Sequence, residues 1–126
     1  MTGTHWVARL RPLALVGAGG FLGAVLRYGL TVGLPSSVPL GTLVANLLGT
    51  FLLGVLLYEA RVADTLGPET RLIVGTGFCS SVTTYSAFAL ETSRLAPVAA
   101  AANIGLHYTL GFGAALLGQA VARWVR

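Results

Sequence analysis

Charged side chains are scarce in this sequence. They make up 10% of the 126 residues, whereas hydrophobic residues make up 55% and the mean hydropathy is +0.79. A soluble domain carries about 25% charged residues, so this chain has too few to cover a surface in water. The deficit excludes an ordinary soluble protein. At roughly 20 apolar residues per span, a single transmembrane domain over residues 1–126 has room for four helices.

Residues that carry catalysis or bind metals are also few. One cysteine, two histidines and four carboxylates form neither a catalytic triad nor a metal-ligand spacing, so an enzyme is not predicted. The lone Cys79 excludes an internal disulfide. Lysine is absent, and the eight arginines are scattered at the ends of hydrophobic stretches rather than clustered. This scatter argues against a nucleic-acid partner.

Four hydrophobic stretches are present, and together they predict an all-α membrane protein. The expected spans are residues 13–34, 40–58, 72–95 and 97–121. Pro12 suits the first position of the first helix. The charged residues between 59 and 71 indicate a solvated connection between the second and third spans.

The third stretch contains a polar run. Six of the seven residues from Ser80 to Ser86 carry a hydroxyl, and the chain is apolar on both sides. Serine and threonine compete with the helical backbone by bonding locally, so we expect a broken third helix. Non-helical backbone at membrane depth is tolerated where it is buried in protein or lines a water-filled cavity. Such breaks free carbonyls and amides to face an ion, so the run predicts an ion-handling protein.

Three further polar residues inside the spans each have two interpretations. Asn46 shares one helix face with Thr42 and Thr50, and it either joins helices or offers its two N–H groups to an anion. Arg27 is either a snorkelling side chain near the interface or a cation at the mouth of an anion pathway. His107 is either a neutral, hydrogen-bonded interior histidine or part of the same pathway.

Three blocks, in this order, resemble the small fluoride-channel family known as Fluc or CrcB. They are GGFLGAVLRY (19–28), GTLVANLLGTFLLG (41–54) and GTGFCSSVTTYSAFALE (75–91). The resemblance implies a four-span subunit that assembles as an antiparallel dimer with two fluoride pathways at the interface. It also implies a structural sodium ion at the dimer centre, held by backbone carbonyls at the two helix breaks.

The resemblance also implies the site residues, position by position. The implied fluoride pathway comprises Arg27, Thr42, Asn46, Tyr85, Ser86, Phe88 and His107. Ser80 and Thr83 fall where the family's sodium-binding carbonyls are supplied. The sequence departs from the family pattern at three places. Tyr85 stands where a pore-facing phenylalanine is usual, Ser80 where glycine is usual, and His107 where many relatives have serine.

The chemistry of fluoride fits these residue types. Fluoride is small and strongly hydrated, so a pore must replace the hydrogen-bond donors of water. Amide N–H and hydroxyl groups can do so, and aromatic ring edges carry the positive end of the ring quadrupole. Conduction also requires that the ion be released, which full positive charges deep inside would prevent. We therefore expect passive, fluoride-selective export across the cell inner membrane or plasma membrane.

Two rival interpretations remain beside this one. A small multidrug antiporter needs a membrane-embedded carboxylate in its first span, and residues 13–34 contain none. A structural or regulatory membrane subunit that transports nothing is not excluded by any residue.

The distribution of arginine also bears on the dimer. Six of the eight arginines fall on the side of the two termini: Arg9, Arg11, Arg61, Arg71, Arg123 and Arg126. The other two, Arg27 and Arg94, fall on the opposite side. Arginine-rich short segments stay in the cytoplasm, so this bias predicts a fixed orientation with both termini inside. A homodimer of antiparallel subunits needs a bias near zero. The sequence therefore leaves open a heterodimer with an oppositely oriented paralogue, in which this subunit is partly or wholly non-conducting.

Overall fold

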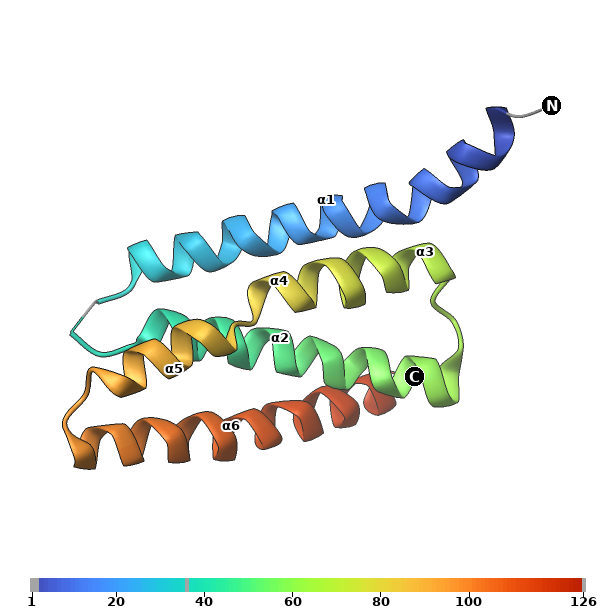
Figure 1. Cartoon of the computed structure of the whole chain (residues 1–126). Coiled ribbons are helices and arrows are strands. Elements are labelled where there is room, and N and C mark those ends of the chain that lie inside the picture. Colours follow the sequence, from blue (N-terminus) through green and yellow to red (C-terminus); the bar gives the residue numbers. More distant parts are fainter. Residues whose placement is uncertain (1–2, 36, 126) are drawn as a thin grey trace.

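The computed structural model describes residues 3–35 and 37–125, and in these residues it is built of helices without a β-strand. Four helical stretches are long and apolar enough to cross a membrane, and they are Trp6–Gly33, Leu40–Ala63, Pro68–Ser93 and Pro97–Trp124. The four lie side by side along one direction (Figure 1). The prediction of an all-α membrane protein with four spans is therefore confirmed.

The spans differ in how regular they are. The first, second and fourth contain long helices, namely α1 (Gly3–Gly33), α2 (Leu40–Tyr58) and α6 (Pro97–Trp124). A π-helical segment, η1 (Glu59–Ala63), extends α2. The third span is assembled from shorter pieces, which are α3 (Pro68–Thr70), the π-helical η2 (Arg71–Cys79), α4 (Ser80–Val82) and α5 (Tyr85–Ser93).

Two predicted boundaries are wrong. The first helix begins at Gly3 rather than near residue 13, so Pro12 lies inside α1 and not at its first position. Membrane helices tolerate an interior proline because neighbouring groups satisfy the freed carbonyl. The helical backbone also continues into the predicted connection and ends at Asp64, which adopts a left-handed conformation with φ of 47°. Aspartate enters this region more readily than most residues.

Small residues let the spans approach closely. A side chain on Gly54 of α2 would collide with the backbone carbonyl of Ala115 on α6, and one on Gly118 would collide with that of Phe51. In the same way, a Cβ on Gly77 of η2 would lie 2.6 Å from the carbonyl oxygen of Val16 on α1. Without a hydrophobic drive between helices in lipid, such close packing is what holds them together.

The arrangement of the ends agrees with the topology predicted from four spans. Both chain ends and the connection between α2 and α3 lie at one end of the bundle, and the two other connections lie at the opposite end (Figure 1). Two ion pairs stand at the first end: Arg11 with Glu69 at 2.6 Å, and Arg71 with Asp64 at 2.7 Å. Arg126, which the charge count included, lies outside the described residues.

Candidate functional site at the interruption of the third span

The third span is interrupted at Thr83 and Thr84. Val82 is the last residue of α4, and the next two residues are extended, with φ and ψ of −79° and 149° at Thr83 and −151° and 122° at Thr84. Helix α5 then begins at Tyr85. The interruption lies inside the hydroxyl-rich run, because these side chains offer the backbone local alternatives to helical bonds.

Asn46 on α2 binds both backbone groups of Thr84. Its Oδ1 accepts a hydrogen bond from the Thr84 N–H at 2.7 Å, and its Nδ2 donates to the Thr84 carbonyl at 3.2 Å. The amide therefore replaces the helical partner that the Thr84 N–H has lost, and it adds a second bond to the Thr84 carbonyl, which as the N-cap carbonyl also begins α5. Asn46 thus joins two spans. A carboxamide has two N–H donors, so one remains beyond the bond to Thr84.

Two hydrogen bonds at the interruption release two carbonyls of the chain. In an unbroken helix the N–H of Thr84 would donate to the carbonyl of Ser80, but here it donates to Asn46. Likewise the N–H of Ala87 donates to the Thr84 hydroxyl at 3.2 Å instead of to the carbonyl of Thr83. The carbonyls of Ser80 and Thr83 thereby lose the partners that a regular helix would give them.

A pocket of about 290 Å³ opens beside the interruption, and we call it the break pocket. Its lining residues come from α2, the interruption, α5 and α6, and they are Asn46, Thr50, Thr83, Thr84, Tyr85, Phe88, His107 and Tyr108. None of these described residues is an aspartate, glutamate, lysine or arginine. The break pocket thus offers amide, hydroxyl, imidazole and aromatic groups without a carboxylate or a permanent positive charge.

Phe88 is the centre of an aromatic cluster in the break pocket. It is 7% exposed, and its ring centroid lies 5.6 Å from that of Tyr85, 4.5 Å from that of His107 and 6.4 Å from that of Tyr108. The planes of Phe88 and Tyr108 meet at 84°, an edge-to-face arrangement. The pairs of Phe88 with Tyr85 and with His107 are tilted, at 54° and 51°.

Two polar residues of α6 face the neighbouring α5. Asn103 is 7% exposed and its Nδ2 donates to the hydroxyl of Thr92 at 2.8 Å. His107, one turn later, lies with Nδ1 at 3.0 Å from the carbonyl oxygen of Asn103. Their four-residue spacing places both side chains on one face of α6, and His107 lines the break pocket.

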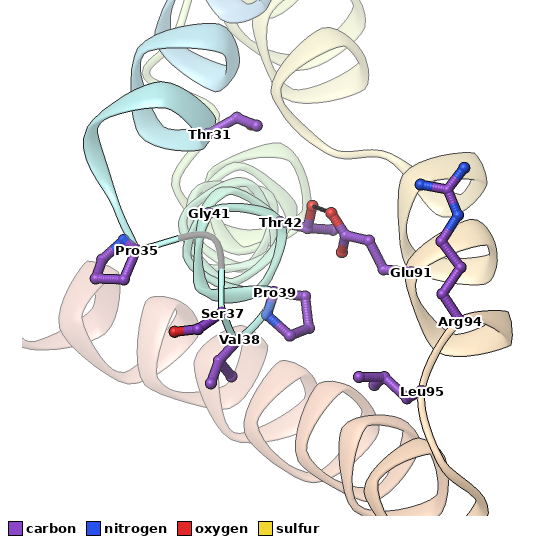
Figure 2. A pocket seen from close by; sticks show the side chains of 10 residues that line it. All are labelled: Thr31, Pro35, Ser37, Val38, Pro39, Gly41, Thr42, Glu91, Arg94 and Leu95. Atoms are coloured by element: carbon purple, nitrogen blue, oxygen red, sulfur yellow. Dashed lines mark hydrogen bonds between the residues drawn. The ribbon is translucent and has the colours of Figure 1, made fainter.

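A second pocket, of about 230 Å³, lies towards the end of the bundle, and we call it the mouth pocket. Figure 2 shows Thr42 and Glu91 pointing toward one another there from α2 and α5, with Arg94 beside them. The Thr42 hydroxyl donates to Glu91 Oε1 at 2.7 Å. Thr42 and Glu91 also line a third pocket, of about 180 Å³, which contains Arg27. These two residues therefore stand between the two cationic side chains.

The structure separates the expected site residues into groups. Those that line the break pocket are Asn46, Thr83, Tyr85, Phe88 and His107. Thr42 and Arg27 lie in the neighbouring pockets instead. Ser86 is exposed and lies 3.2 Å from the Thr84 hydroxyl, oxygen to oxygen, outside the lining of the break pocket. Ser80 lines a separate groove between α2 and the third span.

Three residues of the site were not predicted. Thr84 was noted as part of the hydroxyl run, but no spacing pairs it with Asn46, which is 38 residues away. Tyr108 follows His107 directly and carries no pattern of its own. Glu91 was visible as a charge late in the third span, yet its bond to Thr42 depends on how α2 and α5 pack.

The chain is similar to known proteins over most of its length. The profile of the family described as CrcB-like protein, Camphor Resistance (CrcB), matches residues 14–119. A protein of Natronomonas pharaonis named fluoride-specific ion channel FluC 1 is 51% identical over 114 residues, which cover 90% of this chain and 96% of that protein. A protein of Halobacterium salinarum named fluoride-specific ion channel FluC 2 is 48% identical over 117 residues, which cover 92% of this chain and 90% of that protein. A protein of Haloarcula marismortui named fluoride-specific ion channel FluC 1 is 47% identical over 123 residues, which cover 98% of this chain and 94% of that protein. The chain therefore belongs to the fluoride-channel family known as Fluc or CrcB.

Proposed function

We propose that this chain is a subunit of a passive, fluoride-selective channel that exports fluoride across the cell inner membrane or plasma membrane. The observation that carries the proposal is the break pocket, where uncharged donors and aromatic rings from three spans surround an interrupted helix. The family to which the chain belongs is one of ion channels rather than enzymes, and the relatives compared above are named fluoride-specific.

Fluoride in the break pocket would exchange water for donors of the protein. Asn46 offers the N–H that Thr84 does not use, and the hydroxyl of Tyr85 and the edges of the aromatic rings add further positive ends. Ser86 supplies a hydroxyl just outside this pocket. Because none of the lining residues carries a permanent positive charge, a bound ion is held weakly enough to leave.

Arg27 and Thr42 act, in this proposal, before the ion reaches the break pocket. Arg27 lines the third pocket, and Thr42 and Glu91 line both this pocket and the mouth pocket. A guanidinium at this depth attracts anions without entering the narrow part of the path. Thr42 donates a hydrogen bond to the Glu91 carboxylate, which lines the mouth pocket and not the break pocket.

The proposed channel is an antiparallel dimer. Tyr85 is 72% exposed in the single subunit, and the neighbouring Ser80 and Ser86 are exposed as well, although all three lie in the middle of a span. Polar backbone and hydroxyl groups at membrane depth need a protein cover because lipid offers them no hydrogen bonds. A second subunit placed against the interruption would provide that cover and would complete the pathway, while membrane lipid surrounds the rest.

A structural sodium ion fits the residues of this interface. The carbonyls of Ser80 and Thr83 are released from helical bonding, and a hard monovalent cation takes oxygen ligands of this kind. Main-chain ligands place no demand on the side chain, so serine can stand at position 80. We propose that these carbonyls, together with their counterparts in the second subunit, hold the ion.

A second candidate function is supported by the arginine distribution. Of the arginines in the described residues, five lie towards the end of the bundle that holds both chain ends, and two, Arg27 and Arg94, lie towards the other end. Such a bias directs one orientation in the membrane. The chain would then pair with an oppositely inserted paralogue, and its own pathway would conduct partly or not at all.

Fluoride efflux from liposomes that contain this chain alone tests the proposed function. We expect efflux that proceeds once a potassium ionophore balances the charge, and chloride efflux slower by at least about a hundredfold, as a selective pore requires. A fluoride electrode outside the liposomes measures both the rate and the dependence on the ionophore. Fluoride that moved only under an imposed proton gradient would show a coupled transporter instead.

Asn46→Asp separates the two roles of the amide. The aspartate keeps an oxygen for the Thr84 N–H but loses both donors, so we expect fluoride flux to fall at least about tenfold while the dimer persists on size exclusion. Thr50→Val is the matched control. Thr50 lines the same pocket, but its hydroxyl already donates to the backbone carbonyl of Asn46 at 2.7 Å, so fluoride flux should change little. Wild-type flux in Asn46→Asp would reduce Asn46 to a structural role.

Sodium should protect the dimer against dissociation in detergent more than potassium does. An ion that binds the assembled state stabilises it by about 2.7 kcal/mol when its concentration is a hundred times its dissociation constant. In Asn46→Leu the N–H of Thr84 is free to bond the Ser80 carbonyl again, so the protection should disappear, whereas Ser80→Gly should retain it. Equal stability of the wild-type dimer in both salts argues against the site.

The orientation of the chain distinguishes the two candidate functions. With Cys79 replaced and a single cysteine placed at either terminus, we expect an impermeant reagent added to intact cells to label neither terminus. Labelling of about half of the molecules from outside would show dual orientation, and the heterodimer would then be wrong.

A further inference from the structure

His107 is the one titratable nitrogen base in the described lining of the break pocket, and the roles proposed above leave it unused. Its Nδ1 lies 3.0 Å from the carbonyl oxygen of Asn103. A carbonyl oxygen can only accept, so Nδ1 carries a proton in both the neutral and the charged ring. The other nitrogen, Nε2, is buried and has no hydrogen-bond partner among the described residues.

Protonation changes Nε2 from a hydrogen-bond acceptor to a hydrogen-bond donor. In the neutral ring, with the proton on Nδ1, Nε2 presents a lone pair, which accepts hydrogen bonds and repels an anion. After protonation the same atom becomes a charged donor, and charge-assisted bonds to anions are the stronger kind. The bond to Asn103 orients the ring in both states, so protonation changes the buried Nε2, which has no partner among the described residues.

We infer that His107 is a proton-dependent fluoride-binding group, whose Nε2 donates to fluoride in the break pocket when the imidazole is protonated. The inference rests on the proposed function, since it deepens the role of the same pocket. The bound anion and the proton would each favour the other.

The surroundings of His107 allow this behaviour. From α2 it faces the uncharged Asn46 and Thr50, and from α5 the ring of Phe88 and the phenol of Tyr85; its own helix adds the phenol of Tyr108. No carboxylate among the described lining residues could hold the proton in place of fluoride. The nearest acid on α5, Glu91, bonds Thr42 in the mouth pocket. The Phe88 ring, 4.5 Å away between centroids, can stabilise a cationic imidazole.

Nuclear magnetic resonance of the imidazole nitrogens tests the inference without any conduction assay. The other histidine, His5, is removed by His5→Gln, so the ring signals of the dimer in detergent belong to His107. We expect the proton on Nδ1 at high pH. In sodium fluoride the pH of half-protonation should be higher by at least about 0.5 unit than in sodium chloride of the same ionic strength.

Flux measurements give the second readout. We expect the fluoride concentration for half-maximal flux to fall at least about threefold between pH 8 and pH 6. In His107→Ser the same concentration should stay constant. Liposomes without protein correct for the leak of neutral hydrogen fluoride at the lower pH.

The two readouts keep this inference distinct from the proposed function. Half-protonation that is the same in fluoride and chloride, or a proton on Nε2 at high pH, overturns the role of His107 even if the wild type conducts. A half-maximal concentration that depends on pH equally in the wild type and in His107→Ser overturns it as well. If fluoride shifts the titration but the chain conducts at no pH, the binding group stands and the conducting function fails.

Discussion

The structure depends on one constraint, which is that backbone exposed at membrane depth needs hydrogen-bond partners from the protein. At Thr84 both backbone groups find them in the side chain of Asn46, at 2.7 and 3.2 Å. A carboxamide suits this task because it presents an acceptor and a donor at the spacing of a peptide group. These two bonds join α2 to the extended residues beside the break pocket.

Close packing of the spans is what brings Asn46 to the interruption. Gly49 lies one turn after it on α2, and a side chain there would collide with Thr83 and approach Val82 Cγ1 to 3.0 Å. Gly54 and Gly118 let α2 and α6 approach each other closely, and His107 and Tyr108 of α6 line the pocket. The position of a polar side chain in this protein is thus decided by the small residues around it.

The distribution of charge fits the proposed channel. Permanent charges stand at the ends of the spans, with Arg27, Glu91 and Arg94 around the mouth and the ion pairs of Arg11 and Arg71 at the opposite end. The centre holds neutral dipoles and rings. In the proposed channel, Arg27 and Arg94 would raise the local concentration of an anion, and the neutral donors in the middle would bind it without trapping it.

The amino-acid sequence by itself determined the class of protein, the four spans, the place of the polar run and the shared helix faces, because hydropathy and periodicity act locally. It could not tell whether Asn46 joins helices or lines a pore; the structure shows the first and leaves one N–H for the second. The bonds from Asn46 to Thr84 and from Thr42 to Glu91 join residues 38 and 49 positions apart. Such contacts depend on how whole helices pack, and no local pattern specifies that packing.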